Sequence, residues 1–305
     1  MRIVIALGGN ALGIDPKEQK ENVKKVSPYL AKIINQGNEV VITHGNGPQV
    51  GLINMAFSEG HKHNKNVYEM TFSECGAMSQ SYIGYHLVEA INNDLRKLNS
   101  STHVVSILTN VLVDKDDPAF LNPTKPIGPF YTKEEALLLP YHTKEDSGRG
   151  YRRVIASPKP VKIIEEKEIK NLLDNHYTVI CCGGGGIPVI DNDGTLQGID
   201  AVIDKDFASS KLASDIDADV LLILTQVKNA KINFGKENEQ DLGIICLNDV
   251  IKYLNDNEFK AGSMKPKIEA CINFVKDKNK TAIITDIENA LSALEYKAGT
   301  IIKLL

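Results

Sequence analysis

Three apolar segments of the chain each end abruptly in a glycine-rich turn. The segments read RIVIAL, EVVIT and TVICC, and the turns that follow them read GGNALG, HGNGPQVG and GGGGIP. Short runs rich in β-branched residues and bounded by glycine are typical of buried strands. In an open parallel sheet, the turns at the carboxyl ends of the strands lie along one edge, where ligands bind. The turns therefore predict an α/β protein with a site at that edge.

Helical segments alternate with strands through the first hundred residues. The pattern predicts a helix over 17–36, a strand over 39–43 and a long helical stretch over about 70–98. Asp15 suits the N-cap of the first helix and Pro16 its first turn. This alternation predicts βαβ units. The chain of 305 residues is long enough for one large core or two domains of about 150 residues.

The segment from about 113 to 160 differs from the rest of the chain. It is dense in proline, glycine and charged residues, and its one helical stretch is the short EEALLL. A long excursion of this kind inside a compact fold is typical of a lid or a lobe with a function. A boundary near residue 200 separates a larger lobe, 1–200, from a smaller one, 201–305, although one continuous sheet across that point is equally compatible.

Composition favours a small-molecule partner. The net charge of -4 does not support a nucleic-acid footprint, which needs a basic face. No run approaches the length of about 18 apolar residues that a membrane-spanning helix needs, and no leader is recognisable, so we expect a cytoplasmic protein. The five cysteines, which include Cys181 and Cys182, have neither zinc-site nor C-x-x-C spacing and are expected to be reduced core residues.

The glycine turns themselves suit an anion, because they expose backbone N–H groups at the start of a helix. A P-loop is excluded, since no lysine follows the first turn until Lys17. The second turn has Gly45 and Gly47, but Val50 stands where a dinucleotide fingerprint needs its third glycine. Tight turns that need glycine for a positive φ are the alternative explanation. Asn10 and Asn46 favour anion binding.

The positive charge for such an anion has to come from elsewhere. Lys205 lies in AVIDKDFAS beside Asp206, Lys267 lies in GSMKPK with Ser263 as a candidate N-cap, and Lys125 lies in NPTKPIGPFY. Lysine suits phosphate as a mobile point charge. The alternative for any one of these lysines is that it lies in a solvated loop and binds no anion.

Two other clusters of charged or metal-binding residue types give weaker evidence of a functional site. His61 and His63 are interpreted as part of a solvated loop, and Arg149, Arg152 and Arg153 as an exposed basic face. The sequence contains neither the G-x-S-x-G of a serine hydrolase nor the HRD and DFG elements of a protein kinase.

Seven segments in this order closely resemble the carbamate kinases of the amino acid kinase family. The segments are ALGGNAL, THGNGPQVG, NPTKPIGPFY, GYRRVIASPKP, GGGGIPV, AVIDKDFAS and GSMKPKIEA. The resemblance spans essentially the whole chain. It implies a three-layer αβα sandwich on a mainly parallel central sheet with a small protruding subdomain, and a homodimer. It also implies reversible phosphoryl transfer between ATP and carbamate with Mg²⁺, in fermentative arginine catabolism.

The resemblance also assigns roles to residues. It implies that Lys205 and Lys267 are catalytic, that Asp206 organises them, and that Lys125 covers the carbamate side. The positions that match those holding the phosphoryl group and carbamate are Gly8, Gly9, Asn10, Gly45, Asn46, Gly47, Gly184 and Gly185. The positions that match the nucleotide side are Thr225, Val227, Asn233, Phe234, Met264 and Lys267.

Two positions depart from the pattern of the relatives. Gln226 stands where many have aspartate, and Lys265 stands where the motif reads glycine. The metal ligands stay unassigned. Another kinase on the same fold, for acetylglutamate or UMP, and a non-catalytic nucleotide or anion sensor are the alternatives, and the lobe motif NPTKPIGPFY favours carbamate.

Overall fold

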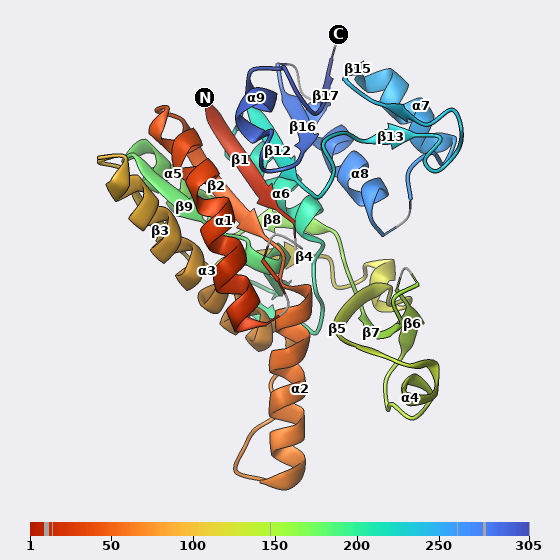
Figure 1. Cartoon of the computed structure of the whole chain (residues 1–305). Coiled ribbons are helices and arrows are strands. Elements are labelled where there is room, and N and C mark those ends of the chain that lie inside the picture. Colours follow the sequence, from red (N-terminus) through yellow and green to blue (C-terminus); the bar gives the residue numbers. More distant parts are fainter. Residues whose placement is uncertain (9–11, 14, 147, 261, 277–278, 305) are drawn as a thin grey trace.

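The computed structural model describes residues 1–8, 12–13, 15–146, 148–260, 262–276 and 279–304 (Figure 1). An eight-stranded sheet forms the centre of the molecule. Its order is β15 (Ile244–Cys246), β17 (Thr300–Lys303), β16 (Thr281–Thr285), β12 (Val220–Leu224), β1 (Arg2–Leu7), β2 (Glu39–His44), β9 (Tyr177–Ile180) and β3 (His103–Ser106). Every neighbouring pair is parallel except β16 and β17.

Helices cover both faces of this sheet, because its strands are apolar on both sides. In β1, Ile3 and Ile5 face a core built with helices α1 (Pro16–Asn35), α3 (Phe72–Lys97) and α9 (Ala290–Leu294). Val4 and Ala6 face the opposite core. The helices on that side are α5 (Glu166–Asp174), α6 (Lys205–Asp215), α7 (Leu247–Asn255) and α8 (Met264–Val275). The expected three-layer αβα sandwich is therefore confirmed.

Three smaller sheets complete the fold. A four-stranded sheet has the order β11 (Thr195–Gly198), β10 (Ile187–Asn192), β4 (Asn110–Val113) and β8 (Pro160–Ile163). A two-stranded ribbon joins β13 (Lys231–Ile232) to β14 (Gln240–Asp241). A three-stranded sheet of β5 (Lys125–Tyr131), β7 (Tyr151–Ile155) and β6 (Thr143–Glu145), with helix α4 (Lys133–Leu137), stands apart from the central sheet (Figure 1). This last sheet is the predicted protruding subdomain, called the lobe below.

Helix α2 (Gly47–His63) connects the lobe to the main body, and the sequence interpretation missed it. Its backbone touches the lobe directly, because a side chain at Gly51 would meet the Cα of Gly128 at 2.1 Å. His61 and His63 lie in its last turn, and His61 Nδ1 lies 2.6 Å from Val67 O. Their expected placement in a solvated loop was therefore wrong.

The start of α1 agrees with its sequence signals. Asp15 is the N-cap, its carboxylate accepts hydrogen bonds from the backbone N–H groups of Lys17 and Glu18, and Pro16 is the first helical residue. The central sheet runs across residue 200, since β12 pairs with β1. The two-lobe division at that residue stays a prediction.

The five cysteines are free thiols, and only Cys246 among them is partly exposed. No helix in the described ranges is both long enough and apolar enough to span a bilayer.

Candidate active site

The strands that lead into the three glycine turns end side by side at the carboxyl edge of the central sheet, as predicted. Strands β1, β2 and β9 are parallel neighbours in the centre of the sheet. Gly8 follows β1 and donates its backbone N–H to Leu224 O at 3.1 Å. A side chain there would lie 2.9 Å from that same oxygen, so the close approach of the two strands requires glycine. Gly9 and Asn10 lie outside the described residues.

The second turn leads into helix α2. Asn46 is the N-cap of α2, but its side chain makes no capping hydrogen bond and instead donates from Nδ2 to Ser79 Oγ at 2.8 Å. The first N–H groups of a helix have no partner within the helix. The N–H groups of Asn46 and Gly47, at the start of α2, therefore have no partner within the helix, while the Asn46 amide holds the turn in place.

The third turn lies behind the second. A side chain at Gly184 would overlap the Asn46 amide at 2.0 Å, and one at Gly185 would meet Ile203 O at 2.2 Å. Both residues also have a positive φ. Packing explains why these positions are glycine, and their predicted contact with the phosphoryl group stays a prediction.

Lys205, Asp206 and Lys267 form one buried cluster, although 61 residues separate Asp206 from Lys267. Packing of α6 on α8 brings them together. Lys267 Nζ donates to Asp206 Oδ2 at 2.7 Å. Lys205 Nζ lies 2.8 Å from Asp206 Oδ1, but the angles there are not those of a hydrogen bond, and Lys205 Nζ has no hydrogen-bond acceptor among the described residues. Its N–H donors are thus available to an anion.

Burial and the carboxylate set the charges of the cluster. Burial lowers the pKa of Lys205, which Asp206 only partly offsets. Burial also acts to lower the pKa of Lys267, but the attraction of Asp206 and Asp204 outweighs it and raises that pKa. Burial alone would raise the pKa of Asp206, yet the two lysines hold it well below its usual value. Asp206 therefore stays ionised.

Lys125 reaches the cluster from the lobe. Its Nζ lies 2.5 Å from Asp204 Oδ2, and Asp204 is the N-cap of α6, immediately before Lys205. Three lysines and two aspartates therefore meet at one end of α6, which leaves an excess of positive charge for an anion. The four residues predicted as catalytic lie close together, as the sequence interpretation requires.

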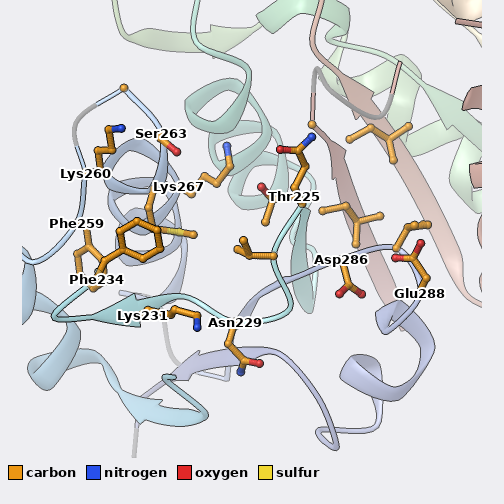
Figure 2. A pocket seen from close by; sticks show the side chains of 18 of the residues that line it. Thr225, Asn229, Lys231, Phe234, Phe259, Lys260, Ser263, Lys267, Asp286 and Glu288 are labelled. Atoms are coloured by element: carbon orange, nitrogen blue, oxygen red, sulfur yellow. The ribbon is translucent and has the colours of Figure 1, made fainter. Parts of the chain in front are cut away.

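A cavity of about 820 Å³ opens beside Lys267. Four other residues predicted for the nucleotide side, Thr225, Val227, Phe234 and Met264, line it together with Lys267. Figure 2 shows Phe234, Phe259, Lys260 and Ser263 on one side of the pocket, Asp286 and Glu288 on the other, and Thr225 between them. Asn233 is not among the lining residues, and its backbone N–H donates to Glu258 Oε2 at 2.7 Å.

Several residues of this pocket were missed from the sequence because they come from distant segments. Gln226, one of the two departures, lines the pocket, whereas Lys265 does not. The lobe also reaches it through Asp146 and Arg149. The further lining residues that sequence analysis did not name are Leu7, Asn22, Lys25, Val26, Leu224, Asn229, Lys231, Glu258, Phe259, Lys260, Gly262, Asp286, Ile287 and Glu288.

The arginine segment of the lobe corrects another expectation. Arg149 is exposed, but Arg152 is buried and Arg153 is half-buried, so the three do not form an exposed basic face. Arg152 Nε donates to Gly128 O at 2.9 Å. Arg153 Nη1 donates to Asn54 Oδ1 at 2.9 Å. The two side chains leave opposite faces of β7 because neighbouring residues in a strand alternate.

His44 lies beneath the second turn and is uncharged at neutral pH. Burial lowers its pKa to about 4, which the hydrogen bond with Gly45 O opposes and the charge of Lys205 reinforces. The described ranges contain no group of three or more His, Cys, Asp or Glu side chains that could hold a metal ion.

Comparison with known proteins agrees with this geometry. The model of the amino acid kinase family matches residues 1–286. The chain is 50% identical to the carbamate kinase-like protein YqeA of Escherichia coli, over 99% of this chain and 98% of that protein. It is 49% identical to the carbamate kinase of Clostridium perfringens, over 98% of this chain and 99% of that protein. The solved structure of carbamate kinase from Giardia lamblia bound to AMP-PNP superposes with a TM-score of 0.91 at 43% identity, over 100% of this chain and 98% of that one.

Proposed function

The chain belongs to the amino acid kinase family, and from this premise we propose that it is a carbamate kinase, an ATP:carbamate phosphotransferase. It transfers a phosphoryl group reversibly between carbamoyl phosphate and ADP. The whole-length similarity to carbamate kinases supports this proposal. The observation that carries it in this structure is the buried cluster of Lys205, Asp206 and Lys267, which lies between the glycine turns and the large pocket.

The reaction needs no general base. In the direction of ATP formation, an oxygen of the ADP β-phosphate attacks the phosphorus of carbamoyl phosphate, and the bond between that phosphorus and the carbamate oxygen breaks. Carbamate leaves as an anion, so no side chain has to move a proton. What remains for the protein is to position the reactants and to neutralise charge, the two effects that dominate phosphoryl transfer.

Each part of the cluster has a role in that task. We assign the transferring phosphoryl group to the donors of Lys205 and Lys267, because Lys205 Nζ has no hydrogen-bond acceptor among the described residues. Asp206 fixes both ammonium groups by contacts of 2.8 and 2.7 Å. Lys125 is brought to the same place by the lobe. The backbone donor of Gly47, with those predicted at Gly9, Asn10 and Gly45, completes the anion site, and Gly8, whose N–H is already bonded to Leu224 O, lines the neighbouring pocket.

The nucleotide occupies the pocket of about 820 Å³, a size within the range of small-molecule sites. Phe234 is 68% exposed at its rim, and an exposed aromatic ring there suits stacking against a base. AMP-PNP is bound in the structure of the Giardia relative. We therefore place the phosphates toward Lys267 and the base toward Phe234.

Magnesium would enter with the nucleotide. No cage of three or more side chains is present in the part of the chain that the structure describes. Mg²⁺ usually binds nucleotide phosphates and water with one or two carboxylates, so this donor set fits a nucleotide-bound ion. Such an ion neutralises phosphate charge. Asp286 and Glu288 are the pocket carboxylates opposite Phe234 and are the candidates to hold it (Figure 2).

Three broader expectations rest on the family resemblance. They are that the protein is a homodimer, that it works in the cytoplasm, and that it serves fermentative arginine catabolism.

A coupled assay tests the proposed function. The protein receives carbamoyl phosphate, ADP and Mg²⁺, and ATP is followed by luciferase luminescence. We expect ATP from this pair and none above background when acetyl phosphate replaces carbamoyl phosphate. In the opposite direction, ADP release is compared for carbamate, acetylglutamate and UMP as acceptors. ADP release with either of the latter two, and no ATP from carbamoyl phosphate, would overturn the assignment.

A further inference from the structure

Arg152 has a buried donor that finds no hydrogen-bond partner in the described part of the chain. The residue is 8% exposed. Two of its nitrogens are satisfied, since Nε donates to Gly128 O at 2.9 Å and Nη1 to Asp146 Oδ2 at 3.2 Å. Nη2 is buried and has no hydrogen-bond acceptor among the described residues. Leaving a buried donor unsatisfied is costly, so such a group in a folded protein calls for an explanation.

The unsatisfied nitrogen points at the N-terminus of α2. A side chain built on Gly47, the first residue of α2, would lie 4.0 Å from Arg152 Nη2. Because Cβ atoms tilt toward the N-terminus of a helix, that position lies in front of the first turn. The donors of that turn have no side-chain cap from Asn46. The partial positive charge of the helix end and a guanidinium group thus face the same small space.

This space adjoins the lysine cluster. Thr43, near the end of β2, shares a hydrogen bond of 2.6 Å with Ser209 of α6. Ser209 Oγ in turn donates to Lys205 O at 2.6 Å. The turn that begins two residues after Thr43 is therefore fixed beside the first turn of α6, which carries Lys205.

We propose that Arg152 binds the carboxylate group of carbamate, and the carbamoyl oxygen of carbamoyl phosphate, through Nη2 together with the N-terminus of α2. The inference rests on the proposed function and adds a substrate-binding residue to it. Carbamate is a small planar anion, and its charge grows on that carboxylate as the bond to phosphorus breaks. Arg152 thus stabilises the leaving group while the lysines hold the phosphoryl group.

The guanidinium group is needed for its shape. It makes contacts with Gly128 O and Asp146 through two nitrogens and stacks 5.0 Å above the ring of Phe130, while the third nitrogen faces the anion. Lysine carries its donors on a single nitrogen and has no planar fork, so it cannot span these separate positions. Since Arg152 belongs to the lobe and α2 to the main body, bound carbamate would also connect these two parts.

Steady-state kinetics of Arg152→Lys test the proposal, with Arg153→Lys as the matched control on the opposite face of β7. For Arg152→Lys we expect the KM for carbamoyl phosphate to rise about tenfold or more, as for the loss of a charge-assisted hydrogen bond, and kcat to fall as well, because the contact strengthens as carbamate leaves. The KM for ADP should change less than about twofold, and Arg153→Lys should leave both KM values within that factor. In Arg152→Ala, added guanidinium at low concentration should restore part of the lost rate.

Gly47→Ala provides a second test that keeps the guanidinium contacts. A methyl group there makes only an ordinary contact at 4.0 Å, so the fold should persist. It would occupy the anion space, and the KM for carbamoyl phosphate should rise while the Tm stays near that of the wild type. An unchanged KM for carbamoyl phosphate in both Arg152→Lys and Gly47→Ala would overturn the proposal.

Failure of the inference and failure of the proposed function have different signatures. If the wild type makes ATP but the Arg152 and Gly47 variants keep its KM for carbamoyl phosphate, the inference alone fails. If the wild type makes no ATP, the proposed function fails. Calorimetric titration of carbamoyl phosphate then still decides the role of Arg152. Binding by the wild type that Arg152→Lys loses supports the anion site, and equal binding by both, or none by the wild type, contradicts it.

Discussion

Replacing Asp206 by asparagine tests how the two catalytic lysines are held. The carboxylate of Asp206 is 3% exposed and lies between Lys205 and Lys267, at 2.8 and 2.7 Å. Asparagine has nearly the same shape but no charge. The variant therefore keeps the packing of α6 on α8 and removes the one anion that contacts both ammonium groups in the described part of the chain.

The size of the effect follows from these distances. With an effective dielectric constant of about 20, each contact has a Coulomb energy of about 6 kcal/mol. Desolvation offsets much of this, and breaking one partner of a buried pair typically costs about 3–5 kcal/mol. We expect the free energy of unfolding to fall by about 3 kcal/mol. If a similar amount is lost in the transition state, kcat falls about 100-fold.

The pH profile gives a second readout. Without the carboxylate, the pKa of both lysines falls, because burial and mutual repulsion are no longer opposed. The activity of Asp206→Asn should therefore decline at a lower pH than that of the wild type as pH rises. Luciferase-coupled kcat, its pH profile and urea unfolding measure these effects. Asp215→Asn, which removes an ion pair with Lys211 in the same helix, is the control. Wild-type kcat and an unchanged pH profile in Asp206→Asn would refute the reasoning.

Two further predictions concern His44 and the contact between α2 and the lobe. The pKa of His44 in the folded protein, about 4, lies below the unfolded value of about 6.5. The contribution of neutral His44 to the free energy of unfolding is therefore fully present above pH 6.5 and is lost as the pH falls toward 4. By pH 5 the free energy of unfolding should have fallen by about 2 kcal/mol, as measured by urea unfolding, and His44→Gln should not show this fall. An equal dependence of the unfolding free energy on pH in the wild type and in His44→Gln would contradict the prediction. Gly51→Ala pushes its new methyl group against Gly128. It should lower the free energy of unfolding by about 1–3 kcal/mol, measured by urea unfolding, and lower kcat in the luciferase assay. Gly76→Ala, whose methyl group meets nothing within 4 Å, should do neither, and equal behaviour of the two variants would exclude a tight lobe contact.

The layered fold was predictable because its signals are local. Alternating apolar strands and helices, the cap at Asp15 and the glycine turns after β1, β2 and β9 each follow from a few neighbouring residues. Helix α2 was missed because Gly47 and Pro48 look like part of a turn. Proline in the first turn of a helix is itself a start signal, which could have identified α2.

The site was predictable only in part, because its members meet through tertiary packing. The resemblance identified Lys205, Asp206 and Lys267, but composition and spacing alone could not bring residues of α6 and α8 together. The role of Arg152 was hidden for the same reason. The alternation of β7 shows that Arg152 and Arg153 leave opposite faces, yet only the fold shows which face meets Gly128 and α2. Asn233 carried a predicted role but does not line the pocket.

The central claim is that Lys205 and Lys267 carry the phosphoryl transfer, and the kcat of Lys205→Ala and Lys267→Ala tests it most directly. Both variants are assayed for ATP formation at saturating carbamoyl phosphate and ADP, after circular dichroism has shown that each is folded. Removing a charge that acts on the transferring group should lower kcat by about 100-fold or more in each. Near-normal turnover in both folded variants would contradict the account.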